Sequence, residues 1–170
     1  MSDINQNDNE AAIILANQKY CTISVCSLDA KPWITPVFYA TDEKLNLFWL
    51  SENSAKHSSL LETNSLASLV IYDSNASMGA GNALYMSGKV CISPESLTDN
   101  ALSLLREKVG SSSEFSDRYT REDVSGESPW RLYALTPSQA WCLDRSSNVR
   151  GWPVVRRVEL NLELLRTVCK

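Results

Sequence analysis

The stretch FWLSENSAKHSSLL, residues 48–61, carries the side chains of this chain that are best suited to hold an anion. An apolar run ends there in serines, an amide, a lysine and the only histidine of the sequence. If a helix begins near Ser54, its first backbone N–H groups have no partner within the helix, and its dipole is positive there. Lys56 adds a full charge to this end, as at phosphate sites on helix N-termini. A plain helix cap followed by an exposed lysine gives the same pattern, so this stretch alone leaves both interpretations open.

The strand-like segment WITPVFYA, residues 33–40, comes shortly before this cluster and carries Pro36 in its middle. Proline has no N–H to donate to a sheet, so Pro36 belongs on an edge strand or at an opening of the sheet. An opened barrel wall beside a phosphate site could present backbone groups to a flat heterocycle. The alternative is an edge strand in which proline prevents aggregation.

The rest of the sequence offers few groups for other chemistry. The only histidine, His57, is next to the presumed phosphate site, so no Ser-His-Asp or Cys-His arrangement is indicated. The five cysteines are scattered without a C-x-x-C pair, which argues against structural zinc and for buried, reduced thiols.

Composition limits the class of protein. The chain has 170 residues, a net charge of −4 and 44% hydrophobic residues, as expected for a globular protein with a single core. The absence of a basic excess argues against nucleic acid as a partner. No apolar run is long enough for a membrane span, and the polar, acidic N-terminus is unlike a signal peptide. We therefore expect no membrane partner and a cytoplasmic location, which reduced thiols also favour.

Local patterns predict a mainly β chain. We expect residues 1–9 to be disordered and residues 10–170 to form one domain, with a short helix over 10–17. Strands over 19–27, 33–40 and 45–51 are joined by short turns, which predicts an antiparallel meander. A helix over 54–63 precedes a strand over 66–73, which is apolar almost throughout and therefore central.

The second half continues this pattern. A strand over 83–93 contains Gly88, which indicates a bulge or a close backbone approach. Ser93-Pro94-Glu95 predicts a helix start, and residues 110–129 are polar and irregular, with a lid as the less favoured alternative to a mobile loop. Strands over 130–137 and 138–144, a loop over 145–154, a strand over 154–160 and a helical turn over 162–168 complete the chain. A barrel with helices on its outside accommodates these elements.

The order of these motifs resembles the FMN-binding split barrel of the pyridoxamine 5′-phosphate oxidase-like proteins. The matching series is P-W-I-T-P-V-F-Y, F-W-L-S-x-x-S-x-K, N-S-L-A-S-L-V-I-Y and L-Y-M-S-G-K-V. It covers residues 10–93 well, and WRLYALTPSQAWCLDR resembles the last barrel strands more loosely. The resemblance implies a six- to seven-stranded antiparallel split β-barrel with two or three flanking helices. It also implies FMN as the cofactor and a homodimer with flavin sites at its interface.

The resemblance assigns roles by position. A strand like 34–39 lines the flavin ring, partly through backbone groups, and the lysine of S-x-K binds the FMN phosphate. Asn82 is the amide closest to the position of a ring-binding glutamine, while Trp141 and Arg145 match residues that reach the flavin across the dimer interface. The implied site consists of Ile34, Thr35, Pro36, Val37, Trp49, Leu50, Ser51, Ser54, Lys56, His57, Asn82, Trp141 and Arg145.

Two departures from the family pattern limit the resemblance. Ala55 stands where members often carry an arginine before the lysine, so one phosphate contact is missing, and His57 or a partner arginine could replace it. The segment WCLDRSSNVRG lacks the R-x-H that the oxidases use for the substrate phosphate. The resemblance is therefore to a flavin-binding relative with an unidentified small substrate, rather than to the vitamin B6 oxidase itself.

Three functions follow from this interpretation. The first is an FMN-dependent oxidoreductase, in which the cofactor carries the redox chemistry and a small molecule exchanges a hydride or electrons with it. The second is a flavin-binding or redox-sensing module without turnover. The third keeps the barrel but changes the ligand to haem or a deazaflavin, with the single histidine as an axial ligand.

Overall fold

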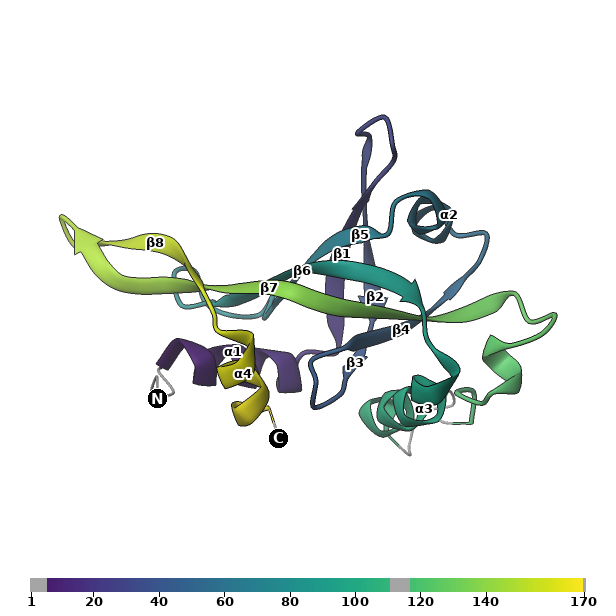
Figure 1. The fold of residues 1–170 in the computed structure, drawn as a ribbon. Helices are drawn as coiled ribbons and strands as arrows, with labels where there is room; N and C mark the ends of the chain where they lie inside the picture. The colour runs from purple at the N-terminus through teal and green to yellow at the C-terminus, as the bar shows by residue number, and fades with distance from the viewer. Residues whose placement is uncertain (1–5, 111–116, 170) are drawn as a thin grey trace.

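One antiparallel sheet of eight strands dominates the computed structural model, which describes residues 6–110 and 117–169 (Figure 1). Four α-helices in this described part of the chain flank the sheet. This confirms the mainly β split-barrel class, with one strand and one helix more than expected. The elements are α1 (Gln6–Asn17), β1 (Tyr20–Cys26), β2 (Pro32–Phe38), β3 (Ala40–Thr41), β4 (Leu47–Glu52), α2 (Lys56–Thr63), β5 (Leu66–Tyr72), β6 (Ala83–Ile92), α3 (Glu95–Val109), the 3-10 turn η1 (Glu122–Val124), β7 (Trp130–Val149), β8 (Trp152–Glu159) and α4 (Leu162–Val168).

The sheet curls so that its two end strands face each other across a split. The strand order is β2-β1-β5-β6-β7-β4-β3, and β8 pairs with β7 beyond this path. Strand β5 is central and β2 pairs only with β1, so the predictions of a central strand and of an edge strand containing Pro36 are confirmed. The predicted three-strand meander is correct for β1 and β2, which pair antiparallel, but β4 pairs with the short strand β3 and with β7 rather than with β2. Strand β4 is thus an interior strand, paired on both sides, and side chains on both of its faces are buried.

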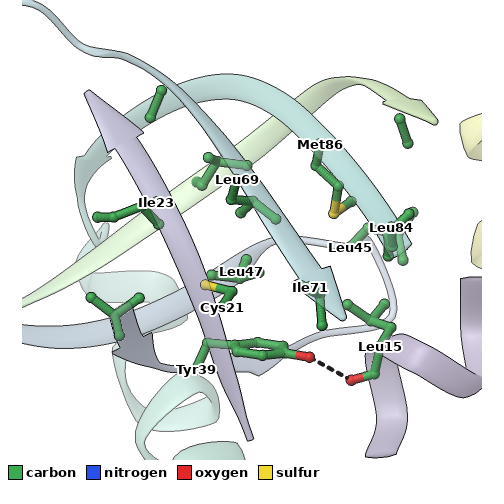
Figure 2. Close-up of a cluster of buried hydrophobic side chains, with 14 of the residues drawn as sticks. Leu15, Cys21, Ile23, Tyr39, Leu45, Leu47, Leu69, Ile71, Leu84 and Met86 are labelled. Carbon is green, nitrogen blue, oxygen red and sulfur yellow. Dashed lines mark hydrogen bonds between the residues drawn. The ribbon is translucent and has the colours of Figure 1, made fainter. Parts of the chain in front are cut away.

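Two apolar clusters lie on opposite faces of the barrel wall. The larger one fills the barrel, with side chains such as Ile23, Leu47 and Leu69 pointing inward (Figure 2). The smaller one joins the outer face of β4 and β7, with Phe48, to the apolar face of α3. The alternation of Leu47, Phe48 and Trp49 along β4 separates the two clusters, because successive side chains of a strand point to opposite faces.

Gly88 allows β6 and β7 to approach closely, as its position in the strand predicted. The register of this pair shifts between Ser87 and Gly88, opposite Pro137. A Cβ atom on Gly88 would lie 2.1 Å from the carbonyl oxygen of Thr136 and 2.9 Å from Cα of Pro137. Only glycine therefore fits this bulge.

The C-terminal third differs from the prediction in its strand count. The two strands expected over 130–137 and 138–144 are one continuous strand, β7. Pro137 lies opposite Gly88 at the bulge, and the pairing of β7 with β6 continues on both sides of it. The loop expected over 145–154 is instead the tip of a β7–β8 hairpin that projects beyond the sheet (Figure 1). Arg150 and Gly151 form its turn, both with positive φ.

The N-terminal helix begins earlier than expected. Helix α1 starts at Gln6, so residues 6–9 are helical rather than disordered, while residues 1–5 lie outside the described part. The Gln6 side-chain amide donates to the Glu10 carboxylate at 2.7 Å, one turn later, and Asp8 is 1% exposed. This hydrogen bond and the burial of Asp8 stabilise the first turn of α1. The polar composition of residues 6–9 gave no indication of either feature.

A half-buried lysine of α3, Lys108, contacts both Tyr39 and helix α1. The Nζ atom of Lys108 lies 3.8 Å above the ring centre of Tyr39 and 3.3 Å from the carbonyl oxygen of Leu15. The Tyr39 hydroxyl donates to the same carbonyl at 2.9 Å, as Figure 2 shows. Burial lowers the pKa of Lys108 to about 8 and raises the pKa of the neighbouring Cys21 thiol to about 12.

We expect Lys108 to make stability rise with pH between about 8 and 10.5. In this window the unfolded state keeps the lysine proton and the native state has lost it, so the unfolded state binds more protons. Raising the pH through this window should increase the free energy of unfolding of the wild type by about 1–2 kcal/mol relative to that of Lys108→Met. This value is smaller than the full pKa difference implies, because Lys108 is partly exposed to solvent. Urea unfolding of both proteins at several pH values measures this change. The buried thiols have the opposite effect on stability, but they are present in both proteins, so the difference between the proteins cancels most of it. Parallel pH curves for the two proteins would contradict it.

Candidate functional site

A buried serine-histidine pair joins the end of β4 to the start of α2. The Oγ atom of Ser51 and Nε2 of His57 lie 2.7 Å apart, and both residues are less than 9% exposed. Burial lowers the pKa of His57, so the ring is neutral near pH 7. The pair fixes the first turn of α2 against the barrel.

The N-terminus of α2 has no side-chain cap. The helix starts at Lys56, two residues later than predicted, and Ala55 is the N-cap residue. The Ser54 hydroxyl donates to the Glu52 carboxylate at 3.3 Å instead of capping the helix. The prediction of a helix N-terminus at this point is therefore correct, and no side-chain cap satisfies its first backbone N–H groups, as the alternative of a plain helix cap would require.

The residues around this turn include polar atoms that lack partners. Lys56 is exposed in the first turn. Among the described residues, the Ser58 hydroxyl and Nε1 of Trp49 are two of the three buried side-chain polar atoms without a hydrogen-bond partner. Ser58 follows His57, and Trp49 lies on the same face of β4 as Ser51. Because buried polar groups are normally satisfied, this end of the barrel has unused hydrogen-bonding capacity.

The implied residues of β2 divide between its two faces. Ile34 and Pro36 are exposed on the outer face, and Ile34 is 64% exposed. Thr35 is half-buried and Val37 is buried, both facing the barrel. Strand β2 contacts α2, so this edge strand and the helix that begins at Lys56 are neighbours.

Trp49 and Leu50 lie on opposite faces of β4. Trp49 is inside the barrel, stacked on Tyr133 with ring centres 5.7 Å apart, whereas Leu50 packs on the α3 side of the same strand. The structure therefore does not bring Leu50 to the α2 turn. Adjacent residues on a strand cannot both face one ligand in the barrel.

The remaining implied residues lie toward the opposite end of the sheet. Asn82 donates to Glu10 of α1 and accepts from the backbone N–H of Leu143 at 3.2 Å. Trp141 pairs with Tyr85 near the same end, and the Arg145 side chain lies outside the described residues. The length of β5 separates this end from α2 by about 20 Å, at roughly 3.3 Å per residue. Within one chain these residues do not meet the α2 turn.

A row of short polar side chains crosses the outer face of the sheet, which the sequence analysis missed. Ser24, Ser68, Ser87 and Gln139 are successive cross-strand neighbours on β1, β5, β6 and β7. They line a shallow hollow of about 500 Å³. In the sequence, the sign of this polar row is Ser68, a polar residue within the otherwise apolar strand LASLVIY.

The described residues contain neither a metal-binding cluster nor a membrane-spanning helix. No group of three or more His, Cys, Asp or Glu side chains in residues 6–110 and 117–169 could hold a metal ion. None of the helices in this part is both long and apolar enough to cross a membrane.

We expect the buried His57 to make the protein less stable in acid. Below pH 6.5 the unfolded state protonates this histidine while the native state resists protonation, so the free energy of unfolding falls as the pH decreases. His57→Gln removes this titration and keeps a side chain that can bond to Ser51. Urea unfolding at pH 7 and pH 5 should show a larger loss of stability for the wild type than for the variant, and equal losses would refute the assignment.

Comparison with known proteins shows the fold. No family model and no curated protein matches the sequence. Among solved structures, a haem-binding protein from Mycobacterium smegmatis aligns with a TM-score of 0.72 and 15% identity over 98% of this chain and 62% of that one. An FAD-binding protein from Mesorhizobium loti aligns with a TM-score of 0.56 and 16% identity, over 78% of this chain and 91% of that one.

A third structure carries the provisional name of a pyridoxamine 5′-phosphate oxidase, from Listeria innocua. It aligns with a TM-score of 0.56 and 13% identity, over 78% of this chain and 94% of that one. At these identities the likeness shows the fold alone, and it confirms the predicted split barrel. The chain spans about three fifths of the length of the mycobacterial protein, and the proteins that share its fold include both flavin and haem binders.

Proposed function

We propose that this protein binds FMN and acts as a flavin-dependent oxidoreductase on a small molecule. The uncapped N-terminal turn of α2 carries the proposal, because it combines open backbone N–H groups with the exposed charge of Lys56. These are the groups that bind a phosphate at a helix N-terminus. The unpartnered hydroxyl of Ser58 supports a polar ligand at this end of the barrel.

The residues present fit the phosphate of FMN better than they fit its ring. Lys56 and the first N–H groups of α2 would hold the phosphate, and the edge strand β2 would offer its backbone at Thr35 and Pro36 to the ring. Leu50 faces away from this site, and the structure offers no direct role for it there. When bound, FMN would supply the hydride or electron transfer.

Asn82 and Trp141 lie at the end of the sheet away from α2, and this location supports a homodimer in this proposal. In one chain these residues are far from Lys56, so they can contact the same flavin only from a second copy. Exposed apolar side chains on the outer face, including Leu66 and Tyr72 at 65% and 49% exposure, are consistent with a contact surface there. The flavin would then lie between two protomers.

Haem is the alternative ligand, since the mycobacterial structure that covers 98% of this chain is a haem-binding protein. The geometry of His57 disfavours it. This histidine is 8% exposed and its Nε2 atom is bonded to Ser51, so that nitrogen is engaged within the protein. Flavin needs no histidine ligand and is the better match.

The proposal also places the protein in a reducing compartment such as the cytoplasm. All five cysteines are free thiols, and none forms a disulfide. Cys21 and Cys142 are buried as expected, whereas Cys26 and Cys169 are partly buried and Cys91 is exposed. Free thiols are typical of proteins in reducing environments. Burial also raises the pKa of Cys142 to about 11, which makes this thiol unreactive.

We expect Lys56→Ala to weaken FMN binding by about 10- to 100-fold, the effect of losing a charge-assisted hydrogen bond of about 1.5–3 kcal/mol. The measurement is a fluorescence titration of FMN into the purified protein. Lys44→Ala is the matched control, because Lys44 is an exposed lysine in the turn before β4, outside the site. Equal affinities of the two variants would refute the phosphate assignment. Tight binding without turnover by any reductant and acceptor would favour the non-catalytic flavin module.

A further inference from the structure

We propose that His57 couples FMN binding to pH, because this histidine takes up a proton when a phosphate binds at the N-terminus of α2. The inference rests on the proposed FMN site and adds its regulation. His57 is the second residue of α2, directly after Lys56, and its Nε2 atom lies 2.7 Å from the Oγ atom of Ser51. A positive charge on this ring therefore lies in the same helical turn as the proposed phosphate site.

The His57 ring is held neutral in the free protein. It is only 8% exposed, and burial lowers its pKa, since a desolvated site disfavours the charged form. A phosphate bound at this turn brings up to two negative charges, which favour the imidazolium over the neutral ring. Residues 53–58 otherwise contain Lys56 as their only permanent cation, so a protonated His57 doubles the positive charge available to the phosphate.

The serine hydroxyl is a partner that permits this change of charge. A hydroxyl can donate to an unprotonated ring nitrogen and accept from a protonated one, so the bond between Ser51 and His57 can persist in both states. A carboxylate in this position would favour the charged ring without any ligand, and a backbone N–H would favour the neutral ring. The pair can therefore respond to a nearby anion, because it is locked in neither state.

The charges already present around α2 do not determine the state of His57. The titratable side chains on α2, at the neighbouring ends of β1, β2 and β4, and opposite Trp49 and Ser51 on β7 are Cys26, Asp29, Lys31, Glu52, Lys56, Glu62, Arg131 and Tyr133. Asp29 is paired with Lys31 at 2.6 Å, and Arg131 donates to the carbonyl oxygens of Gly126 and Ser128. Burial alone causes the lowered pKa of His57 within the described part of the chain.

Thermodynamic linkage gives the direction of the effect. If bound FMN favours the protonated ring, protonation of the ring must strengthen FMN binding by the same factor. FMN should therefore bind more tightly as the pH falls from 8 to 6, by up to about tenfold if the His57 titration moves by one pH unit.

The single histidine of the chain allows a direct test by NMR. A ¹H–¹³C spectrum of the full-length protein contains one imidazole Cε1–Hε1 signal, whose position against pH gives the titration midpoint of His57. Saturating FMN should move this midpoint upward by about one pH unit or more. An excess of riboflavin, which carries the same ring without the phosphate, should leave it unchanged.

A comparison of affinities gives a second measurement. The ratio of the FMN Kd of His57→Gln to that of the wild type should be at least threefold larger at pH 6 than at pH 8. The phosphate of FMN itself gains a proton near pH 6, but this affects both proteins equally and cancels in the ratio.

Two results would overturn this inference and leave the proposed function intact: an unchanged His57 midpoint in a protein that binds FMN, and an equal upward shift with riboflavin. A ratio of affinities that does not depend on pH would do the same. Failure of the folded wild type to bind FMN at any pH would instead refute the proposed function, and the regulation with it.

Discussion

Replacing Gly88 with valine should prevent this chain from forming a stable barrel. Even the first added carbon would lie 2.1 Å from the carbonyl oxygen of Thr136 and 2.9 Å from Cα of Pro137. Both are backbone atoms of β7, which cannot move without breaking the longest ladder of the sheet. Overpacking usually costs about 1–3 kcal/mol, but a backbone clash of this size should exceed about 4 kcal/mol.

Thermal unfolding monitored by circular dichroism measures this effect, and Gly88→Ala should already lower the melting temperature strongly. Gly81→Ala is the matched control. A Cβ atom there would lie 3.2 Å from the Cβ atom of Ala76, a contact that a surface loop can relieve. A stable, native-like Gly88→Val protein would show that β6 and β7 do not pack as described.

The second large effect concerns the cluster beneath α3. Leu105→Ala should lower the free energy of unfolding by about 2–5 kcal/mol, the usual cost of truncating a fully buried leucine. Leu105 is 0% exposed and packs in the cluster that contains Phe48 and Leu102. The variant leaves the barrel interior intact and removes only the contact of α3 with the outer face of the wall.

Urea unfolding of Leu105→Ala and of Leu104→Ala compares two adjacent leucines of the same helix. Leu104 is only half-buried at the edge of the cluster, so its truncation should cost about 1 kcal/mol or less. Similar losses for the two variants would contradict the assigned face of α3.

The position of a strand in the sheet could be predicted where one residue or one short segment determines it. Pro36 indicated an edge strand because it lacks an N–H, and Gly88 indicated a close approach because it lacks a Cβ atom. The apolar strand β5 is central, as its composition predicted. Each of these features depends on one residue or one short segment.

Pairing between distant segments could not be predicted in the same way. The ladder of β4 with β7 joins residues about eighty positions apart, so the short turns around β4 gave no sign of it. The bulge opposite Gly88 also allows Pro137 to lie within β7, where proline would ordinarily end a strand. The sequence therefore predicted the fold class better than the order of its strands.

The same distinction applies to the candidate site. The cluster around Lys56 is local in sequence, and the structure places it at a helix N-terminus as expected. The bond between Ser51 and His57 depends on how α2 folds back on β4, and the sequence suggested only that both residues were near an anion. The alternation along β4, which the sequence already contains, places Leu50 on the side of the strand opposite to Ser51.

The most direct test of the account is the visible absorption spectrum of the purified protein after addition of FMN and removal of the excess by desalting. We predict that flavin bands remain with the wild type and are lost from Lys56→Ala, with both proteins folded by circular dichroism. A folded, colourless wild type that retains no FMN would contradict the proposal. The N-terminus of α2 would then be an ordinary helix end, and the split barrel would remain without its proposed redox function.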